Sequence, residues 1–221
     1  GYHHRLFTTP SPEVQELLDA LSTNLDHSAR LMIEDGPAAL YDEVHLPGIL
    51  PVVTGVEQIG GPYPYTFIAH HFATFQTDFA MGRPLASFSA DEFREYLDLY
   101  NVGWIVTASP AGHDGIVRLL NAGGNLDDGG GIVWSSPRYT LWRLNRPRSF
   151  TDNPDDRVRA GYNRIEIELA AIPERFLLRY HWDRGVKAAP PAVVLKERVL
   201  DDPVPFIVVD PNGASSIVIK Y

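Results

Sequence analysis

The sequence contains no cysteine, which excludes disulfide bonds, cysteine-based zinc sites and thiol nucleophiles. It also has no apolar run that approaches the roughly 20 residues needed to cross a bilayer. Basic residues are scarce in one region: residues 11–100 hold 14 acids and three arginines, in a chain of net charge −9. Such a surface repels phosphate backbones, so we expect no nucleic-acid partner.

The common sequence motifs of catalysis are missing as well. There is no glycine-rich phosphate-binding loop ending in Lys-Ser or Lys-Thr, no GxGxxG fingerprint and no GxSxG nucleophile elbow. No HExxH or HxH spacing occurs, and the glycines of residues 123–131 are typical of a hairpin connection. We therefore expect no cofactor, no metal ion and no catalytic residue in this chain.

What is present indicates a folded protein rich in turns. Hydrophobic residues make up 44% of the chain and charged residues 21%, which is ordinary for a globular protein. Glycine and proline number 18 each, a content that favours many turns and long connections over a helical bundle.

Helix and strand patterns alternate through the first two thirds of the chain. Ser11 and Pro12 are suited to the start of a helix, and Ser89 and Glu92 have the spacing of a capping box. The expected elements are helices over 11–25, 89–100 and 114–120 and strands near 29–34, 102–107, 132–135 and 139–144. Residues 1–146 are therefore predicted to form a small α/β domain.

Residues 36–88 show no clean period and are broken repeatedly by glycine and proline. Their many aromatic side chains argue against disorder, so we expect an ordered, aromatic-lined loop region with short strands or helical turns, one of them near 52–59. This region is the first candidate for a binding surface.

After a polar linker over 147–156, the pattern becomes all strand. Alternating residues at 164–169 are followed by short strands at 176–182, 193–199, 205–209 and 215–220. Residues 157–221 are predicted to form a β-sandwich-like domain. The fold class is thus α+β: an N-terminal small α/β layer with long ordered loops, followed by a C-terminal all-β sandwich-like unit.

Three carboxylates are candidates for a site. Glu34 and Asp35 end a predicted buried strand, where functional groups gather in open α/β sheets. A carboxylate pair formed with Glu57 would suit a carbohydrate hydrolase if the two groups lay about 5 to 10 Å apart. Adjacent surface carboxylates are far more often solvated or capping groups.

Aromatic and imidazole side chains are the other candidates. Tyr63 and Tyr65 follow a Gly-Gly-Pro turn, and sugars are bound by ring stacking combined with polar contacts. His70 and His71 are adjacent, a spacing that serves a single metal ion poorly, so hydrogen bonding or packing is the simpler interpretation. Trp104, in the predicted strand 102–107, is a further candidate for substrate binding.

Several short segments of the sequence, taken together, resemble those of a known protein family. They are LPVVTG (50–55), IGGPY (59–63), GRPL (82–85), LYNVGWIV (99–106), YNRI (162–165), LRYHW (178–182) and DPVPFI (202–207). The chain resembles, over residues 11–221, the extracytoplasmic C-terminal region of bacterial polytopic membrane proteins related to the GT-C glycosyltransferases.

That resemblance implies an N-terminal bundle of transmembrane helices outside this chain, a lipid-linked sugar donor and a location on the extracytoplasmic face of the membrane. The family's catalytic acid lies in a loop between membrane helices, and no position here matches it. The resemblance therefore implies a non-catalytic role in glycan or lipid-linked-sugar recognition, with the transmembrane bundle as partner. Two alternatives stay open: a free-standing carbohydrate hydrolase, and a structural self-association domain marked by an exposed apolar patch.

Overall fold

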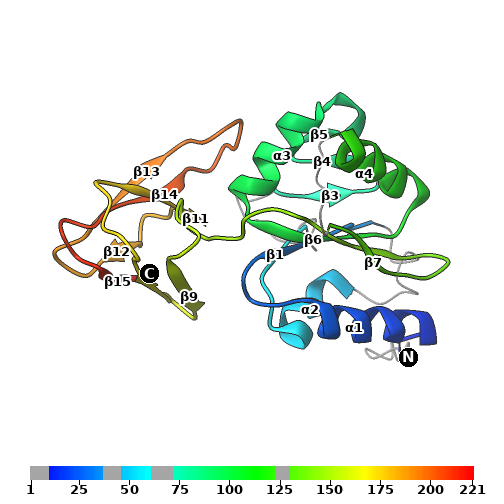
Figure 1. Cartoon of the computed structure of the whole chain (residues 1–221), viewed down its shortest axis with the longest axis horizontal. Helices are drawn as coiled ribbons and strands as arrows, with labels where there is room; N and C mark the ends of the chain where they lie inside the picture. Colours follow the sequence, from blue (N-terminus) through cyan, green and yellow to red (C-terminus); the bar gives the residue numbers. More distant parts are fainter. Residues whose placement is uncertain (1–9, 37–45, 61–71, 123–129) are drawn as a thin grey trace, which may run out of the picture. The chain divides into compact units, whose positions relative to one another are not determined.

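The computed structural model describes residues 10–36, 46–60, 72–122 and 130–221. It is a mixed α+β structure with a β-sandwich-like C-terminal region, as the sequence predicts (Figure 1). Two compact units divide the chain: residues 1–95 with 102–146, and residues 96–101 with 147–221. The second unit therefore includes the short segment 96–101, which comes from the middle of the sequence.

The first unit is built on a five-stranded sheet of order β2-β1-β6-β8-β7. Strands β2, β1 and β6 are parallel, whereas β8 and β7 form an antiparallel hairpin beside β6. The strands are β1 (Arg30–Ile33), β2 (Gln58–Ile59), β6 (Val102–Thr107), β7 (Gly131–Ser135) and β8 (Thr140–Arg143). Every residue of β1 and β6 is buried, as expected for central strands covered on both faces.

Helices cover both faces of this sheet (Figure 1). Helices α1 (Pro12–Asn24) and α2 (Leu46–Thr54) pack on one face, where they share a core with Leu31, Trp104 and Leu141. Helix α4 (Pro110–Ala122) lies against the opposite face. Helix α1 begins as the sequence predicts, because the Ser11 side chain accepts the N–H of Val14 and Pro12 occupies the first turn.

Residues 46–60 and 72–88 contain more regular structure than their sequence indicates. They form α2, β2, a small antiparallel sheet of β3 (Phe75–Gln76), β4 (Phe79–Ala80) and β5 (Arg83–Pro84), and a 3-10 turn over Leu85–Ser87. Helix α2 contains a glycine and an internal proline, which weaken local helix propensity. It forms because Leu46 and Leu50 are fully buried in the core, an energetic gain that no local pattern reveals.

Helix α3 (Ala90–Leu99) begins with the predicted capping box. The Glu92 carboxylate accepts the N–H of Ser89 at 2.8 Å, and the Ser89 hydroxyl accepts the N–H of Glu92 at 3.2 Å. The helix ends at Leu99, and the turn that follows it contains Asn101, whose φ of 50° lies in the left-handed region that asparagine tolerates.

The second unit contains two facing sheets, one of order β12-β15-β10-β9 and one of order β11-β14-β13. Their strands are β9 (Arg157–Gly161), β10 (Arg164–Glu168), β11 (Phe176–His181), β12 (Lys187–Ala188), β13 (Val193–Glu197), β14 (Phe206–Asp210) and β15 (Ser216–Lys220). Strands β10 and β15 alternate buried and open positions, so Ile165 pairs with Ile219 and Ile167 with Ile217 on the inner face.

Residues 147–156, predicted as a linker, are hydrogen-bonded into the second unit. The Asp156 carboxylate accepts the N–H of Ala170 at 2.8 Å, and Asp152 accepts the N–H of Leu177 at 2.8 Å. The guanidinium of Arg179 donates to the carbonyl oxygen of Ser149 at 2.6 Å. The polar side chains of this segment form hydrogen bonds with nearby backbone groups. A solvated linker has the same amino-acid composition, so composition alone does not distinguish the two.

Candidate functional site

The carboxyl ends of the parallel strands β1 and β6 meet at one edge of the five-stranded sheet. Glu34 follows β1 directly, and its carboxylate accepts the backbone N–H of Ala108 at 2.7 Å and that of Ser109 at 3.0 Å. These two residues follow β6 and lead into α4. The Ser109 hydroxyl accepts the N–H of Gly112 at 3.0 Å, so Ser109 caps the helix.

Glu34 is fully buried, and this burial raises the pKa of its carboxyl above the ordinary range. The hydrogen bonds from Ala108 and Ser109 act in the opposite direction but do not cancel the effect. Helix α4 approaches very closely: a Cβ on Gly112 would lie 2.5 Å from the Glu34 carboxylate oxygen Oε2 and 2.8 Å from the carbonyl oxygen of Thr77. Glycine is therefore required at position 112 for the helix to reach this carboxylate.

An open cleft of about 700 Å³ lies at this edge of the sheet. Its walls come from the beginnings of α1 and α4, from β7 and from the turn between β7 and β8. The lining residues are Glu13, Ala108, Ser109, Pro110, His113, Ile132, Ser135, Ser136, Pro137, Arg138 and Thr140. The lining thus combines serine and threonine hydroxyls, an imidazole, a guanidinium and a carboxylate with a few apolar surfaces.

The charged groups of the cleft are matched within the chain. The Glu13 carboxylate accepts the Ser136 hydroxyl at 2.6 Å and the backbone N–H of Arg138 at 3.1 Å, and it lies 3.7 Å from the guanidinium of the same arginine. Glu13 also occupies the first turn of α1, where a negative charge is favourable. The Glu34 carboxylate lies in the same way at the N-terminus of α4. The N-termini of α1 and α4 are therefore each already occupied by a carboxylate.

His113 presents a half-exposed imidazole to the cleft. Its ring lies 5.4 Å from the ring of the buried Trp142, and its Nδ1 is 3.4 Å from the carboxylate of Asp114. The ring is thus held by packing on one side and has room on the other. A neutral imidazole carries one hydrogen-bond donor and one acceptor, so it suits a hydroxyl group as partner.

The structure separates the residues that the sequence singles out. Glu34 lies beneath the cleft, and Asp35 is partly buried, with its N–H donating to Phe75 at 2.7 Å. Glu57 lies at the other end of β1, where it forms an ion pair of 2.8 Å with Arg30. The carboxylates of Glu34 and Glu57 therefore do not face each other across a cleft, as a glycosidase pair would.

Trp104 is 1% exposed and belongs to the core between the sheet and α1. It lines neither of the two pockets described here, so its indole has no face open to a ligand. The candidates Tyr63, Tyr65, His70 and His71 lie outside the described residues.

The residues that line the cleft escape prediction from sequence. Ser109 and Pro110 do give a local signal, because a serine followed by a proline after a buried strand indicates the start of a helix. The predicted helix nevertheless begins only at residue 114. Glu13, His113 and Arg138 give none, because they come from three separate elements and only the fold brings them to one cleft.

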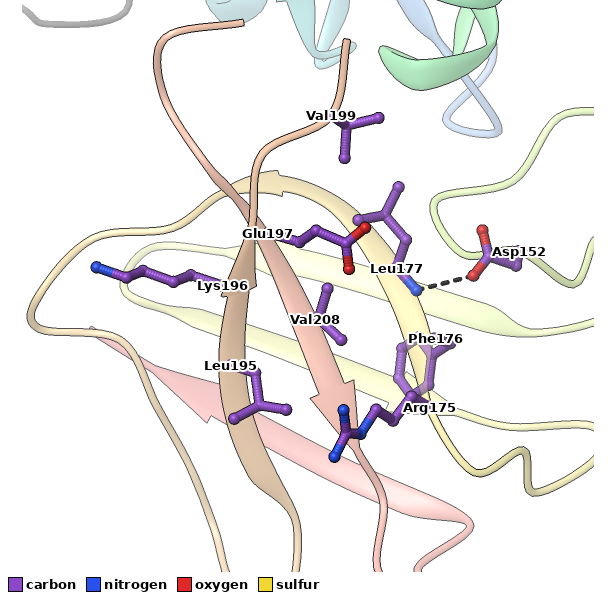
Figure 2. A pocket seen from close by; sticks show the side chains of 9 residues that line it. All are labelled: Asp152, Arg175, Phe176, Leu177, Leu195, Lys196, Glu197, Val199 and Val208. Atoms are coloured by element: carbon purple, nitrogen blue, oxygen red, sulfur yellow. Dashed lines mark hydrogen bonds between the residues drawn. The ribbon is translucent and has the colours of Figure 1, made fainter.

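The second unit has a smaller pocket of about 390 Å³ on the outer face of the β11-β14-β13 sheet (Figure 2). It is lined by Asp152, Arg175, Phe176, Leu177, Leu195, Lys196, Glu197, Val199 and Val208. Within the described ranges, no group of three or more His, Asp or Glu side chains is placed to hold a metal ion. No helix among them is long and apolar enough to cross a membrane.

Comparison with known proteins gives no match. Neither protein-family models, nor curated proteins, nor solved structures show significant similarity to this chain. The site is therefore interpreted from its own chemistry. The cleft offers many neutral hydrogen-bonding groups around balanced charges, an arrangement suited to binding.

Proposed function

We propose that this chain is a non-catalytic recognition domain that binds a neutral glycan in the cleft beside Ser109, His113 and Arg138. The observation that carries the proposal is the polar, charge-balanced lining of a 700 Å³ cleft at the carboxyl edge of a parallel sheet. Clefts at this edge are the usual ligand sites of open α/β sheets.

The charge balance favours a sugar over a phosphate. A phosphate site needs unmatched positive charge, from basic side chains or helix N-termini. In this cleft Arg138 is paired with Glu13, and the N–H groups of Ala108 and Ser109 donate to Glu34. A polyhydroxylated neutral ligand exchanges hydrogen bonds with hydroxyl and imidazole groups without such a charge requirement.

The parent molecule proposed for this domain is a glycosyltransferase-like membrane protein, with the domain on the extracytoplasmic face beside its transmembrane bundle. The support is the resemblance of the sequence phrases given above and a cleft suited to holding a glycan while chemistry proceeds elsewhere. Fractionation of cells carrying the full-length protein tests this context. We expect the protein in the membrane fraction, with this domain cleaved by protease added from outside; a fully soluble protein contradicts it.

Binding is tested by titrating the domain with neutral, anionic and phosphorylated oligosaccharides and following backbone amide shifts by NMR. Neutral sugars are expected to shift Ser109, His113 and Ser135, with weaker effects from charged analogues. The substitution Ser135→Ala removes an exposed hydroxyl of the lining and should weaken binding about fivefold, the loss of one hydrogen bond.

His113→Ala should weaken binding further, and His27→Ala is its matched control, because His27 is exposed outside the cleft. Affinity that is unchanged by both cleft substitutions, or a preference for the phosphorylated sugars, would contradict the proposal.

A second candidate, self-association, is favoured by the exposed apolar face of α2. Ile49, Val52 and Val53 follow helical spacing and are 41%, 88% and 49% exposed. If this face mediates self-association, sedimentation equilibrium will detect a dimer that Val52→Lys converts to monomer. A wild-type chain that stays monomeric at high concentration would dismiss this candidate.

A further inference from the structure

The pocket of the second unit is distinct from the proposed glycan cleft and has different chemistry. Its floor is a ladder of three aliphatic side chains across the β11-β14-β13 sheet: Leu177 pairs with Val208, and Val208 with Leu195 (Figure 2). The three side chains therefore lie in one row, on the outer face of the sheet.

Core packing does not explain this ladder. The inner face of the same sheet is supplied by the alternate positions, including Leu178, Ile207 and Val209, which are fully buried. An outward face of an antiparallel sandwich sheet normally carries polar side chains. Here Leu195 remains 36% exposed, so apolar surface is kept in contact with water at a recessed site.

The positive charges around the pocket are already engaged. The Arg175 guanidinium lies 3.9 Å from the carboxylate of Asp210. Lys196 points away from the floor, with its amine 4.5 Å from the centre of the Trp182 ring (Figure 2). Lys196 is therefore not directed to a ligand above the aliphatic ladder, and the Arg175 guanidinium lies on the side of Val208 away from Glu197 (Figure 2).

The negative charges are differently placed. Asp152 accepts one hydrogen bond, from the N–H of Leu177 at 2.8 Å, and keeps acceptor capacity on its carboxylate. The Glu197 carboxylate is turned toward Leu177 and has no ion pair or hydrogen bond within the described part of the chain (Figure 2). The pocket thus combines an aliphatic floor with an available carboxylate at its rim.

We propose that this pocket binds an alkylammonium group, with its methylene chain on the Leu177–Val208–Leu195 ladder and its charge beside Glu197. A lysine side chain of a partner peptide and a free aliphatic amine share this chemistry. The methylenes replace water over the ladder, and the ammonium group supplies the donors that the Glu197 carboxylate lacks.

Titrations with hexylamine, hexanol and hexanoate, followed by backbone amide NMR of the whole chain, test the proposal. Hexylamine is expected to shift Leu177, Leu195, Glu197 and Val208 and to bind at least fivefold more tightly than hexanol, the size expected of a half-exposed ion pair. Hexanoate should bind most weakly, and added salt should weaken hexylamine alone. Equal binding of all three ligands would overturn the proposal.

Two substitutions separate the charge from the floor. Glu197→Gln should weaken hexylamine about fivefold and leave hexanol unchanged, whereas Glu168→Gln, on the opposite sheet, should change neither. Leu195→Ala should weaken both ligands, because it removes part of the ladder. Hexylamine binding that is unaffected by Glu197→Gln refutes the role of the carboxylate.

The source of the ammonium group is distinguished by a further pair of ligands, N-acetyl-lysine methylamide and its Nζ-acetylated form. Tighter binding of the lysine derivative than of hexylamine indicates a peptide partner, and the reverse indicates a free amine. Loss of binding on acetylation is expected in either case; retention of binding would contradict the proposal.

Discussion

The imidazole Nε2 of His181 lies 2.8 Å from a carboxylate oxygen of Asp202, whose side chain is completely buried in the second unit. The same carboxylate accepts the hydroxyl of Tyr100 and the N–H of Val204. The His181 ring is held between aromatic neighbours, with its centre 4.6 Å from the Phe206 ring and 6.0 Å from the Tyr100 ring. This cluster joins segment 96–101 to the strands of the second unit, of which the segment is a part.

We expect His181→Phe to destabilise the second unit by about 3 kcal/mol in urea unfolding, because it keeps the ring packing but leaves a buried carboxylate without one of its hydrogen-bond partners. Asp202→Asn in the His181→Phe background should recover part of this loss, since it removes the buried charge. Additive losses in the double variant would show that the two side chains act independently.

Asp202 also predicts an acid-dependent stability. Burial raises the pKa of its carboxyl, but the hydrogen bonds from His181, Tyr100 and Val204 outweigh this and leave the pKa below the ordinary range. A lowered folded-state pKa stabilises the protein above the unfolded pKa of about 3.9, and this contribution is lost as pH falls through the folded value. Unfolding free energies measured between pH 6 and 2 should therefore converge for wild type and Asp202→Asn at the acid end.

For Glu34 we expect stability to depend on pH in the opposite direction. Burial raises the pKa of its carboxyl, so the folded state holds the proton more tightly than the unfolded state does. Its contribution to stability is fully present below the unfolded pKa of about 4.3 and declines as pH rises through the folded pKa. Relative to Glu34→Gln, wild type should lose stability across this window; a difference that is constant between pH 4 and 8 would contradict the assignment.

Gly112→Ala tests the close approach of α4 to Glu34. Alanine at a helical glycine normally adds about 0.5 to 1 kcal/mol of stability. Here the added Cβ would meet a buried carboxylate and a backbone carbonyl, so we expect a net loss of about 1 to 3 kcal/mol in thermal or urea unfolding. Ala111→Gly, at an exposed position of the same turn, calibrates the propensity effect.

Trp104→Ala distinguishes a core role from a binding role. The indole is buried between the sheet and α1, so the substitution should cost about 3 to 5 kcal/mol of stability. Trp104→Phe should retain most of the stability and leave sugar binding unchanged, because residue 104 does not line the cleft. A folded Trp104→Phe variant that loses sugar binding would restore Trp104 as a ligand contact.

Local sequence signals predicted the elements whose formation depends on neighbours along the chain. Strand β6 (Val102–Thr107) has the predicted bounds because its apolar run is long enough to be buried on both faces. The capping box of Ser89 and Glu92 joins atoms only three residues apart. Helix α4 is longer than predicted, because Pro110 and Ser109 start it one turn before its apolar face begins.

By itself, the sequence determined the α+β class, the change to an all-strand pattern in the last third and the starts of α1 and α3, because periodicity, caps and turn residues act over a few residues. Tertiary structure alone decided that Glu34 meets Ala108 and Ser109, that Glu57 is neutralised by Arg30, and that Glu13 and Arg138 share a cleft. These pairs are separated by 27 to 125 residues. Their contact depends on strand order and on which sheet face each helix covers, and no local pattern encodes either.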